Sequence, residues 1–160
     1  MRKENLSVTI RTLPPDEPAP EELLHLADES PESVGECLAR GVCRIARFGE
    51  RTVGVSVLLR TRPFTMELAA LAVTPGLQGR GIGRQLIADA VRCAREAGCR
   101  ILEVGTGNSG IGQLALYQKC GFSIVSVDTD YFRRHYPRPI VENGIECRHM
   151  IRMRMELEER

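Results

Sequence analysis

A glycine-rich turn between a buried strand and an amphipathic helix constrains the fold of this chain more than any other feature. The run from Met66 to Val73 is apolar except for Glu67 and stops at Pro75 and Gly76. Such a run, bounded by turn residues, predicts a buried strand. Apolar residues then recur at helical spacing and predict a helix with one buried face: Ile82, Leu86, Ile87, Ala90, Val91 and Ala94.

The turn itself, Gln78-Gly-Arg-Gly-Ile-Gly83, has the composition of an anion-binding loop. The first N–H groups of a helix have no backbone partner, and glycines allow a ligand to approach them closely. The positive end of the helix dipole and two flanking arginines favour negative charge at the same place. We therefore expect a pyrophosphate group to bind at Gln78, Gly79, Arg80, Gly81, Ile82, Gly83 and Arg84.

Composition favours a single domain over residues 1–160. The chain is 42% hydrophobic and has a net charge of +1, which suits one packed core and gives no indication of a nucleic-acid or membrane partner. We find no signal-peptide pattern and no run of bilayer-spanning length. The six cysteines lie mostly in apolar stretches without metal-ligand spacing. We therefore expect a reduced, cytoplasmic protein that holds no metal.

Hydrophobic periodicity predicts a mixed sheet with helices on its faces, an α/β or α+β fold with the order βααβββαβαββ. The expected strands cover residues 6–10, 42–48, 53–60, 66–73, 101–104, 122–127 and 145–157. The expected helices begin at Glu21 and Pro31 and cover 83–97 and 111–120. Residues 131–146 read as irregular because they contain two prolines and Asn143-Gly144.

A second glycine motif, Gly105-Thr-Gly-Asn-Ser-Gly110, competes with the first. It follows a predicted strand and resembles both the dinucleotide-binding fingerprint and the cofactor loop of S-adenosylmethionine-dependent methyltransferases. Those folds carry the motif on their first strand and then need several βα units, whereas only about 50 residues remain here. A tight turn that requires glycine is therefore favoured, and a nucleotide role stays open.

Two motifs together resemble the GNAT superfamily of N-acetyltransferases. Gln78-Gly-Arg-Gly-Ile-Gly83 matches its acetyl-CoA-binding signature, Q/R-x-x-G-x-G/A, and Asn108 with Leu116-Tyr-Gln-Lys-Cys-Gly-Phe122 is similar to its second motif. The expected element order also fits from residue 6 to 157. The resemblance implies a mixed, mostly antiparallel sheet that is splayed at its two middle strands and flanked by about four helices. It also implies acetyl-CoA as the co-substrate.

The resemblance assigns further residues to the cofactor. The main chain from Leu71 through Ala72 to Val73 would pair with the pantetheine arm, and an N–H near Val73 would polarise the thioester carbonyl. Asn108 would also contact the arm, although the stretch from Asn108 to Tyr117 is about two residues longer than in many relatives.

Acetyl transfer to an amine needs a base for the amine and a proton for the departing thiolate. Glu67 resembles the general base of some GNAT histone acetyltransferases, and Glu103 resembles the proposed base of GNAT enzymes that acetylate protein N-termini. The sequence does not decide between them, and a solvent-facing or ion-paired role is open for each. Tyr117 matches the usual general acid of the superfamily, with core packing as its alternative.

The expected acceptor is a primary amine on a small molecule or a peptide. Acidic residues on its predicted side would attract a cation: Asp28, Glu29, Glu32, Glu36, Asp128 and Asp130. The aromatic segment from Tyr131 to Pro139 has three open roles, a substrate lid, a packed surface loop or a homodimer contact. Two other functions also stay open: a methyltransferase or dinucleotide enzyme using Gly105–Gly110, and a regulator that binds acyl-CoA without turnover.

Overall fold

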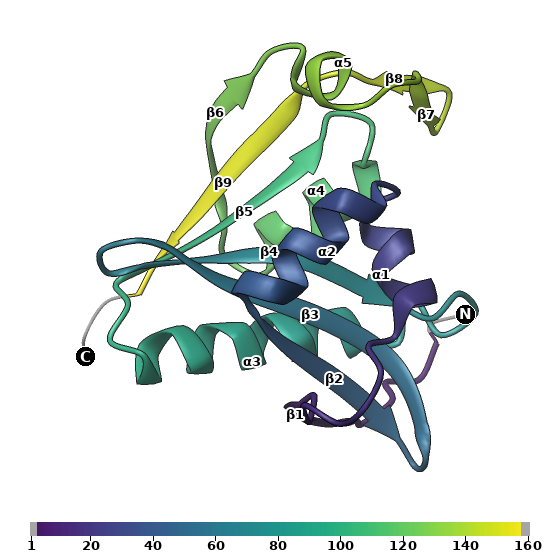
Figure 1. Ribbon diagram of the computed structural model, residues 1–160, viewed down its shortest axis with the longest axis vertical. Helices are drawn as coiled ribbons and strands as arrows, with labels where there is room; N and C mark the ends of the chain where they lie inside the picture. The colour runs from purple at the N-terminus through teal and green to yellow at the C-terminus, as the bar shows by residue number, and fades with distance from the viewer. Residues whose placement is uncertain (1–2, 158–160) are drawn as a thin grey trace.

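Seven strands form the central sheet of the computed structural model, which describes residues 3–157 (Figure 1). They are β1 (Thr9–Thr12), β2 (Val42–Phe48), β3 (Arg51–Arg62), β4 (Thr65–Val73), β5 (Ile101–Gly107), β6 (Ser123–Asp128) and β9 (Met150–Glu156). Their spatial order is β1-β2-β3-β4-β5-β9-β6, and only β4 and β5 run parallel. The sheet is therefore mixed and mostly antiparallel, as predicted.

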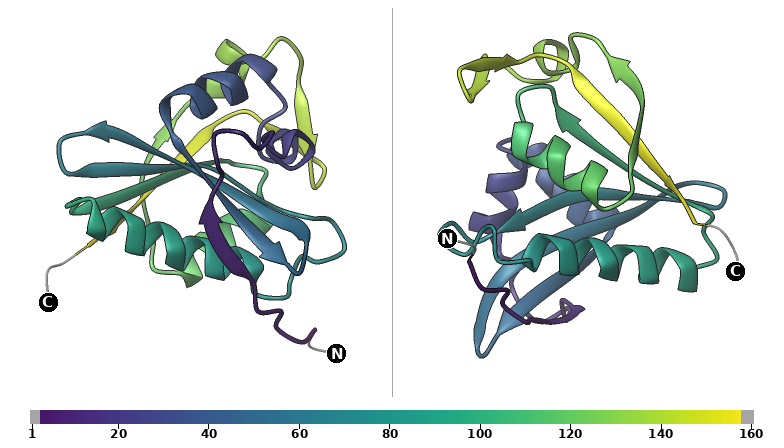
Figure 2. Two further views of the ribbon diagram at one scale, coloured as in Figure 1. Left: turned by 60° about the horizontal axis from the view of Figure 1, so that its bottom comes forward. Right: turned by 180° about the vertical axis from the view of Figure 1, so that it is seen from behind.

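Helices cover both faces of this sheet. They are α1 (Glu21–Ala27), α2 (Pro31–Arg40), α3 (Ile82–Glu96), α4 (Ile111–Lys119) and the short α5 (Tyr131–His135). Figure 2 shows α1 and α2 on one face and α3 and α4 on the other. The second helix begins as the sequence predicts, with the Ser30 side chain accepting the Ser33 N–H at 3.2 Å and proline at the first helical position.

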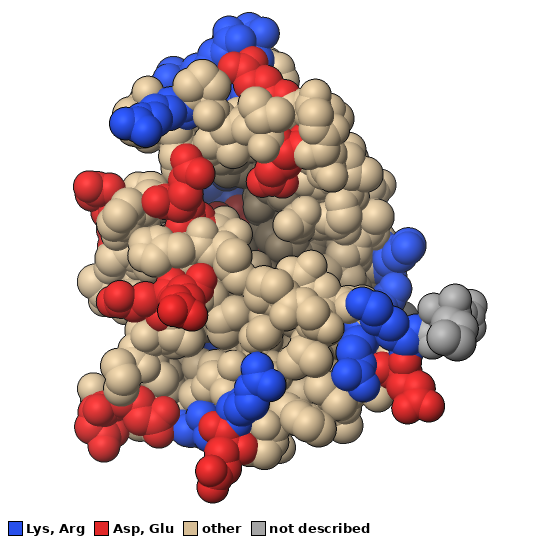
Figure 3. All heavy atoms as spheres, turned by 90° about the vertical axis from the view of Figure 1, so that its right-hand side faces the viewer, with Lys and Arg blue, Asp and Glu red and all other residues tan. Residues whose placement is uncertain are grey.

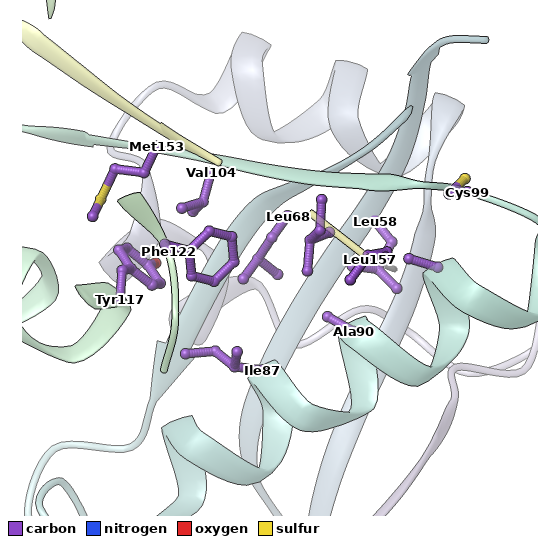
Figure 4. Packing of buried hydrophobic residues seen from close by; sticks show 12 residues of the cluster. Leu58, Leu68, Ile87, Ala90, Cys99, Val104, Tyr117, Phe122, Met153 and Leu157 are labelled. Carbon is purple, nitrogen blue, oxygen red and sulfur yellow. The ribbon is translucent and has the colours of Figure 1, made fainter. Parts of the chain in front are cut away.

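The largest core cluster lies between the sheet and helices α3 and α4 (Figure 4). It joins Ile87 and Ala90 of α3 to Leu68 and Val104 of the two central strands, and it includes Tyr117 of α4. Burying these side chains is the main free-energy term that fixes α3 and α4 against the sheet.

The sheet opens between its two parallel strands. The pairing of β4 with β5 runs from Thr65 opposite Ile101 to Leu68 opposite Val104 and then ends. Beyond that point β4 stays paired with β3 as far as Val73, while β5 stays paired with β9 as far as Gly107. Figure 1 shows β5, β9 and β6 turning away from the other strands. One edge of each central strand is thus left without a strand partner, which is the splay that the sequence resemblance implies.

A bulge in β4 decides which side chains face each side of this opening. Leu58 lies opposite Leu68 and Val57 opposite Ala70, so Ala69 has no residue opposite it in β3. Leu68 consequently packs into the α3 side of the core and Ala70 against the cluster that holds α1 and α2.

The prediction that residues 131–146 are irregular is wrong. They form α5 and the hairpin of β7 (Ile140–Glu142) and β8 (Ile145–Cys147). The hairpin turns at Asn143 and Gly144, both with positive φ, and Asn-Gly is the strongest short hairpin signal in a sequence. Aromatic rings four residues apart stack along α5, Tyr131 on His135 and Phe132 on Tyr136.

Four predicted strands also need new boundaries, two of which, 53–60 and 101–104, are only lengthened, to β3 and β5. The last one, 145–157, is divided into β8 and β9. The first, 6–10, begins only at Thr9, because the preceding chain is held by the glycine-rich turn and α3 instead. There the Leu6 N–H donates to the Arg80 carbonyl at 2.9 Å and the Val8 N–H to Gln85 Oε1 at 3.1 Å.

Candidate active site

The turn between β4 and α3 has backbone angles that require glycine. Gly76, Gly79 and Gly81 have φ values of +90°, +76° and +83°, in the left-handed region that other residues seldom adopt. Gly81 directly precedes α3, and no side chain caps the helix there. The first N–H groups of α3 consequently face outward, beside the positive end of a fifteen-residue helix.

A cavity of about 590 Å³ extends from this turn along the open edge of β4. Nine of the predicted cofactor residues line it: Leu71, Ala72, Val73, Gln78, Gly79, Gly81, Ile82, Gly83 and Arg84. The sequence did not indicate the opposite wall, which comes from Gly112, Gln113 and Leu116 of α4. A Cβ on Gly83 would lie 3.3 Å from Leu116 Cδ2, so α4 packs closely against the start of α3 at this glycine.

Three predicted cofactor residues lie outside this cavity wall: Arg80, Asn108 and Tyr117, which the resemblance also assigns to cofactor binding. The Arg80 side chain donates from Nε to the Glu4 carbonyl at 3.0 Å and so holds the N-terminal segment beside the turn. Asn108 accepts the N–H groups of Arg148 and His149 at 2.8 Å each and donates to the Glu146 carbonyl at 3.1 Å. The Asn108 side chain thus connects the end of β5 to the link between β8 and β9.

Tyr117 packs on the α3 side of the sheet, where the pairing of the central strands ends. Its side chain is buried in the cluster of Leu68 and Val104, with its ring edge-on to Phe122 at 5.7 Å between centroids (Figure 4). Within residues 3–157 the Tyr117 hydroxyl has no hydrogen-bond partner. Burial raises the pKa of this hydroxyl, so it stays protonated at neutral pH.

Glu67 and Glu103 lie opposite each other in the parallel register of the central strands. The Glu103 carboxylate forms an ion pair with Arg62. Glu67 has neither a hydrogen bond nor an ion pair among the described residues, although it is partly buried. Burial is the main reason that the pKa of Glu67 is raised; Arg152 works against this shift, and the charge of Glu103 adds to it.

These two glutamates face the opposite side of the sheet from Tyr117. Leu59, the residue opposite Glu67 in β3, is the side chain that a Cβ on Gly41 at the end of α2 would strike, so this row of side chains points toward α2. The carboxylates and the tyrosine thus approach the opening between β4 and β5 from its two faces.

Figure 3 shows a hollow in the molecular surface with acidic side chains around its rim. Acidic residues occur along α1, α2 and their connection, where a cationic acceptor was expected. Five of the six predicted acceptor-side acids have partners within the described chain. Glu32 accepts the Ser30 hydroxyl at 3.3 Å, and Glu36 pairs with Arg40 at 3.5 Å. Asp28 accepts the Tyr136 hydroxyl at 2.7 Å, Asp128 pairs with Arg134 at 2.7 Å, and Asp130 pairs with Arg148.

The second glycine motif serves packing. A Cβ on Gly105 would lie 2.7 Å from Met150 Sδ, and one on Gly107 would lie 2.3 Å from Cys147 Sγ. Glycine therefore lets β8, β9 and α5 close over the end of β5. The described part of the chain also contains no cluster of metal-ligating side chains and no helix long and apolar enough to span a membrane.

A mixed sheet that opens between two parallel strands, beside a glycine-rich turn at a helix N-terminus, defines the N-acyltransferase class of fold. The chain belongs to the GNAT family of acetyltransferases: the sequence profile of the Acetyltransferase (GNAT) family matches residues 8–122. It is therefore a GNAT N-acetyltransferase, and the reading of Gly105–Gly110 as a methyltransferase or dinucleotide site is not upheld.

Three similar proteins illustrate this membership. The uncharacterised N-acetyltransferase YvbK of Bacillus subtilis is 51% identical over 136 residues, which cover 85% of this chain and 88% of YvbK. The structure of an IAA acetyltransferase from Bacillus cereus is 52% identical, with a TM-score of 0.91, and covers 94% of this chain and 100% of its own. A GNAT acetyltransferase from Elizabethkingia anophelis, solved with acetyl-CoA bound, is 41% identical, with a TM-score of 0.92 and coverages of 94% and 98%.

Proposed function

We propose that this protein transfers the acetyl group of acetyl-CoA directly to a primary amine, with Glu67 as the base and Tyr117 as the group that stabilises the departing sulfur. The observation that carries the proposal is the opening between β4 and β5, which has a desolvated carboxylate on one face and a tyrosine hydroxyl on the other.

The cavity fits the chemistry of acetyl-CoA in three places. Outward N–H groups at the start of α3, with Arg84 beside them, suit a pyrophosphate. The unpaired edge of β4 from Leu71 to Val73 offers N–H and C=O groups to an extended amide-containing arm. The bound co-substrate would supply a thioester, and a β4 N–H would polarise its carbonyl.

Glu67 is the better of the two candidate bases. Arg62 occupies the Glu103 carboxylate, whereas the Glu67 carboxylate has no such partner in the described chain. Its raised pKa brings it closer to the pKa of an amine and makes it a stronger base than an exposed glutamate. The proton removed from the ammonium group would pass to Glu67 directly or through water, and the neutral nitrogen would then attack.

Tyr117 suits the departing thiolate. Because burial raises its pKa, the phenol keeps its proton throughout the working pH range. Such a phenol is a weaker acid than a thiol, so its contribution is a hydrogen bond that strengthens as negative charge develops on sulfur. This differs from full proton transfer, which the sequence resemblance alone would suggest.

The test is CoA-thiol release from acetyl-CoA with a panel of free amino acids, alkylamines, spermidine and short peptides. We expect Glu67→Gln to lower kcat/KM by about 100-fold or more, as loss of a general base does. We expect Glu103→Gln, the matched variant on the neighbouring strand, to lower it by less than about tenfold.

The pH profile is the second readout. In the wild type, kcat/KM should rise with pH through the raised pKa of Glu67, because only the carboxylate accepts a proton. Glu67→Gln should lose this rising limb, and Glu103→Gln should keep it. Equal losses in the two variants, or an unchanged limb in Glu67→Gln, would remove Glu67 from the base role. Binding of acetyl-CoA without thiol release from any amine would favour the regulator alternative.

A further inference from the structure

Arg152 of β9 is a cation that the proposed reaction does not use, although it lies on the acceptor face. Glu67 is opposite Glu103, and Glu103 is opposite Arg154. Residues two apart on a strand share a face, so Arg152 lies on the same face as both glutamates. Two strand spacings and two residues separate Arg152 from Glu67, which puts their Cα atoms on the order of 12 Å apart.

Within the described chain the guanidinium of Arg152 makes one ion pair, a long one with Asp128. It lies 5.8 Å from the centre of the Tyr131 ring, and its nearest carboxylate oxygen, on Asp128, is 3.8 Å away. Asp128 itself is already bonded to Arg134 at 2.7 Å. Within residues 3–157 the Arg152 side chain donates no hydrogen bond. The N–H groups of Arg152 are therefore available to a ligand beside the Tyr131 ring.

Arg152 and Glu67 influence each other without pairing. Arg152 is the strongest of the cations acting on Glu67, yet no nitrogen of Arg152 comes within 4 Å of its carboxylate oxygens. Two opposite charges that share one face without pairing match a ligand that carries both charges. The ammonium end of such a ligand would meet Glu67, and its anionic end would meet Arg152.

From this juxtaposition we infer that the acceptor is a small amino acid-like molecule, whose amine is presented to Glu67 and whose carboxylate is bound by Arg152. The inference rests on the proposed function, because it places the reacting amine at Glu67. In a peptide the carboxylate next to the N-terminal amine is replaced by an amide. The inference therefore narrows the acceptor from peptides to free amino-carboxylates.

The anionic end is a carboxylate rather than a phosphate. One planar guanidinium can bind a carboxylate through two parallel hydrogen bonds. One guanidinium balances the single charge of a carboxylate, whereas a phosphate dianion carries more negative charge than Arg152 can balance, and the Asp128 carboxylate is only 3.8 Å from Arg152. Met150 lies beside Gly105, the residue opposite Arg152, and the Tyr131 ring lies beside Arg152, so both offer apolar surface to the side chain of the amino acid.

The experiment compares phenylalanine, phenylalaninamide and phenethylamine, which share a ring and a primary amine but differ in the carboxylate. Calorimetry on the CoA-saturated protein measures the affinity for each, and thiol release from acetyl-CoA measures kcat and KM. We expect wild-type protein to bind phenylalanine about tenfold or more tightly than the other two, since a hydrogen-bonded charge pair has that effect.

Arg152→Gln should raise the Kd and KM for phenylalanine by about tenfold while changing those for phenethylamine by less than about twofold. Arg152→Lys should restore part of the preference, because the charge returns without the planar pair of donors. Arg154→Gln, the matched variant two residues along the same strand, should leave the preference intact.

Three outcomes would overturn the inference: equal affinity for the three compounds, an equal effect of Arg152→Gln on all of them, or no amino acid bound while a peptide is acetylated. The binding assay does not depend on turnover, so it decides the inference by itself. Failure of the proposed function has a different signature, which is unchanged turnover in Glu67→Gln.

Discussion

Glu67 and Glu103 lie directly opposite each other on neighbouring strands, yet their carboxylates have different surroundings. Arg62 projects from the end of β3 and pairs with Glu103. Glu67 is partly buried without a partner in the described chain, which destabilises its charge and raises its pKa. The sequence predicts two carboxylates on neighbouring strands, but it does not indicate that Arg62 pairs with only one of them, because that contact depends on the folded structure.

The proposed role of Tyr117 can be tested by removing its hydroxyl group. Tyr117→Phe keeps the ring and its edge-on contact with Phe122 but loses the hydroxyl. The hydroxyl has no hydrogen-bond partner in the described chain, so we expect the free energy of unfolding to change by less than about 1 kcal/mol. We expect kcat to fall about 100-fold, because the departing sulfur loses its hydrogen bond. Thiol release at saturating acetyl-CoA measures this effect.

Calorimetry with acetyl-CoA provides the control for that variant, because the Tyr117 side chain is not part of the cavity wall. The Kd for acetyl-CoA should stay within about twofold of the wild type. A variant with full turnover would leave Tyr117 with core packing alone.

At the scale of elements, the start of α3 depends on one backbone conformation. Gly81 has φ of +83°, and a Cβ there would lie 3.1 Å from Asn5 Oδ1. Gly81→Ala should cost about 1 to 2 kcal/mol in the free energy of unfolding, because alanine is strained in the left-handed region. It should also weaken acetyl-CoA binding about tenfold, because relief of that strain turns the helix-terminal N–H groups away from the cavity.

Gly35→Ala is the matched control for this element. Gly35 lies within α2, has ordinary helical backbone and has open space where a Cβ would go. Alanine there should leave acetyl-CoA affinity unchanged and stabilise the protein by about 0.5 to 1 kcal/mol. Thermal unfolding and calorimetry on both variants make the comparison. An unaltered acetyl-CoA affinity in Gly81→Ala would show that the turn tolerates a different conformation.

Elements with strong periodicity were predictable from the sequence, and short elements were not. The boundaries of β2 are those predicted, and those of α3 differ by one residue at each end. Five-residue α5 and three-residue β7 and β8 are too short for a periodic signal to emerge, and only the Asn143-Gly144 turn marks the hairpin in the sequence. Their formation depends on contacts from elsewhere, such as the Tyr136 hydroxyl on Asp28 and the Asn108 bonds to residues 146–149.

At the scale of the whole molecule, the opening in the sheet belongs to no single element. β4 is held by β3 and β5 by β9, while α3 and α4 meet beneath the opening where Gly83 and Leu116 approach each other. The sequence resemblance implied a splay and the residues on its β4 edge. It did not indicate where the pairing of β4 with β5 ends, because that point depends on packing among β3, β4, β5 and β9.

One buried ion pair links α3 to the far edge of the same sheet. Arg44 of β2 donates to both Asp89 carboxylate oxygens, at 2.9 and 2.6 Å, and to Thr12 of β1 at 2.8 Å. The side chains of Arg44 and Asp89 are only 12% and 7% exposed. Burial alone would raise the pKa of Asp89, but the hydrogen bonds from Arg44 and Arg92 outweigh it, so the net pKa is lowered.

Asp89→Asn should therefore destabilise the whole domain, because it leaves the Arg44 charge buried without a counter-charge. We expect a loss of about 3 kcal/mol in the free energy of unfolding and a fall in Tm of roughly 6 to 12 °C. A carboxyl whose pKa is lowered by folding stabilises the protein above its unfolded pKa of 3.8 and loses that effect as the pH falls through its folded pKa. The gap between the two proteins should accordingly narrow in acid.

Glu96→Gln is the control for this prediction, because it removes a carboxylate charge from the same helix at an exposed position. Glu96 pairs with Arg92 on the same helix, but its side chain is 65% exposed. An exposed pair of this kind contributes less than about 1 kcal/mol, so its loss should shift Tm only slightly and with no strong dependence on pH. Denaturant unfolding across the acid range measures both variants. Equal stabilities for Asp89→Asn and Glu96→Gln would mean that apolar packing alone holds α3 on the sheet, and that Arg44 remains solvated when its partner is lost.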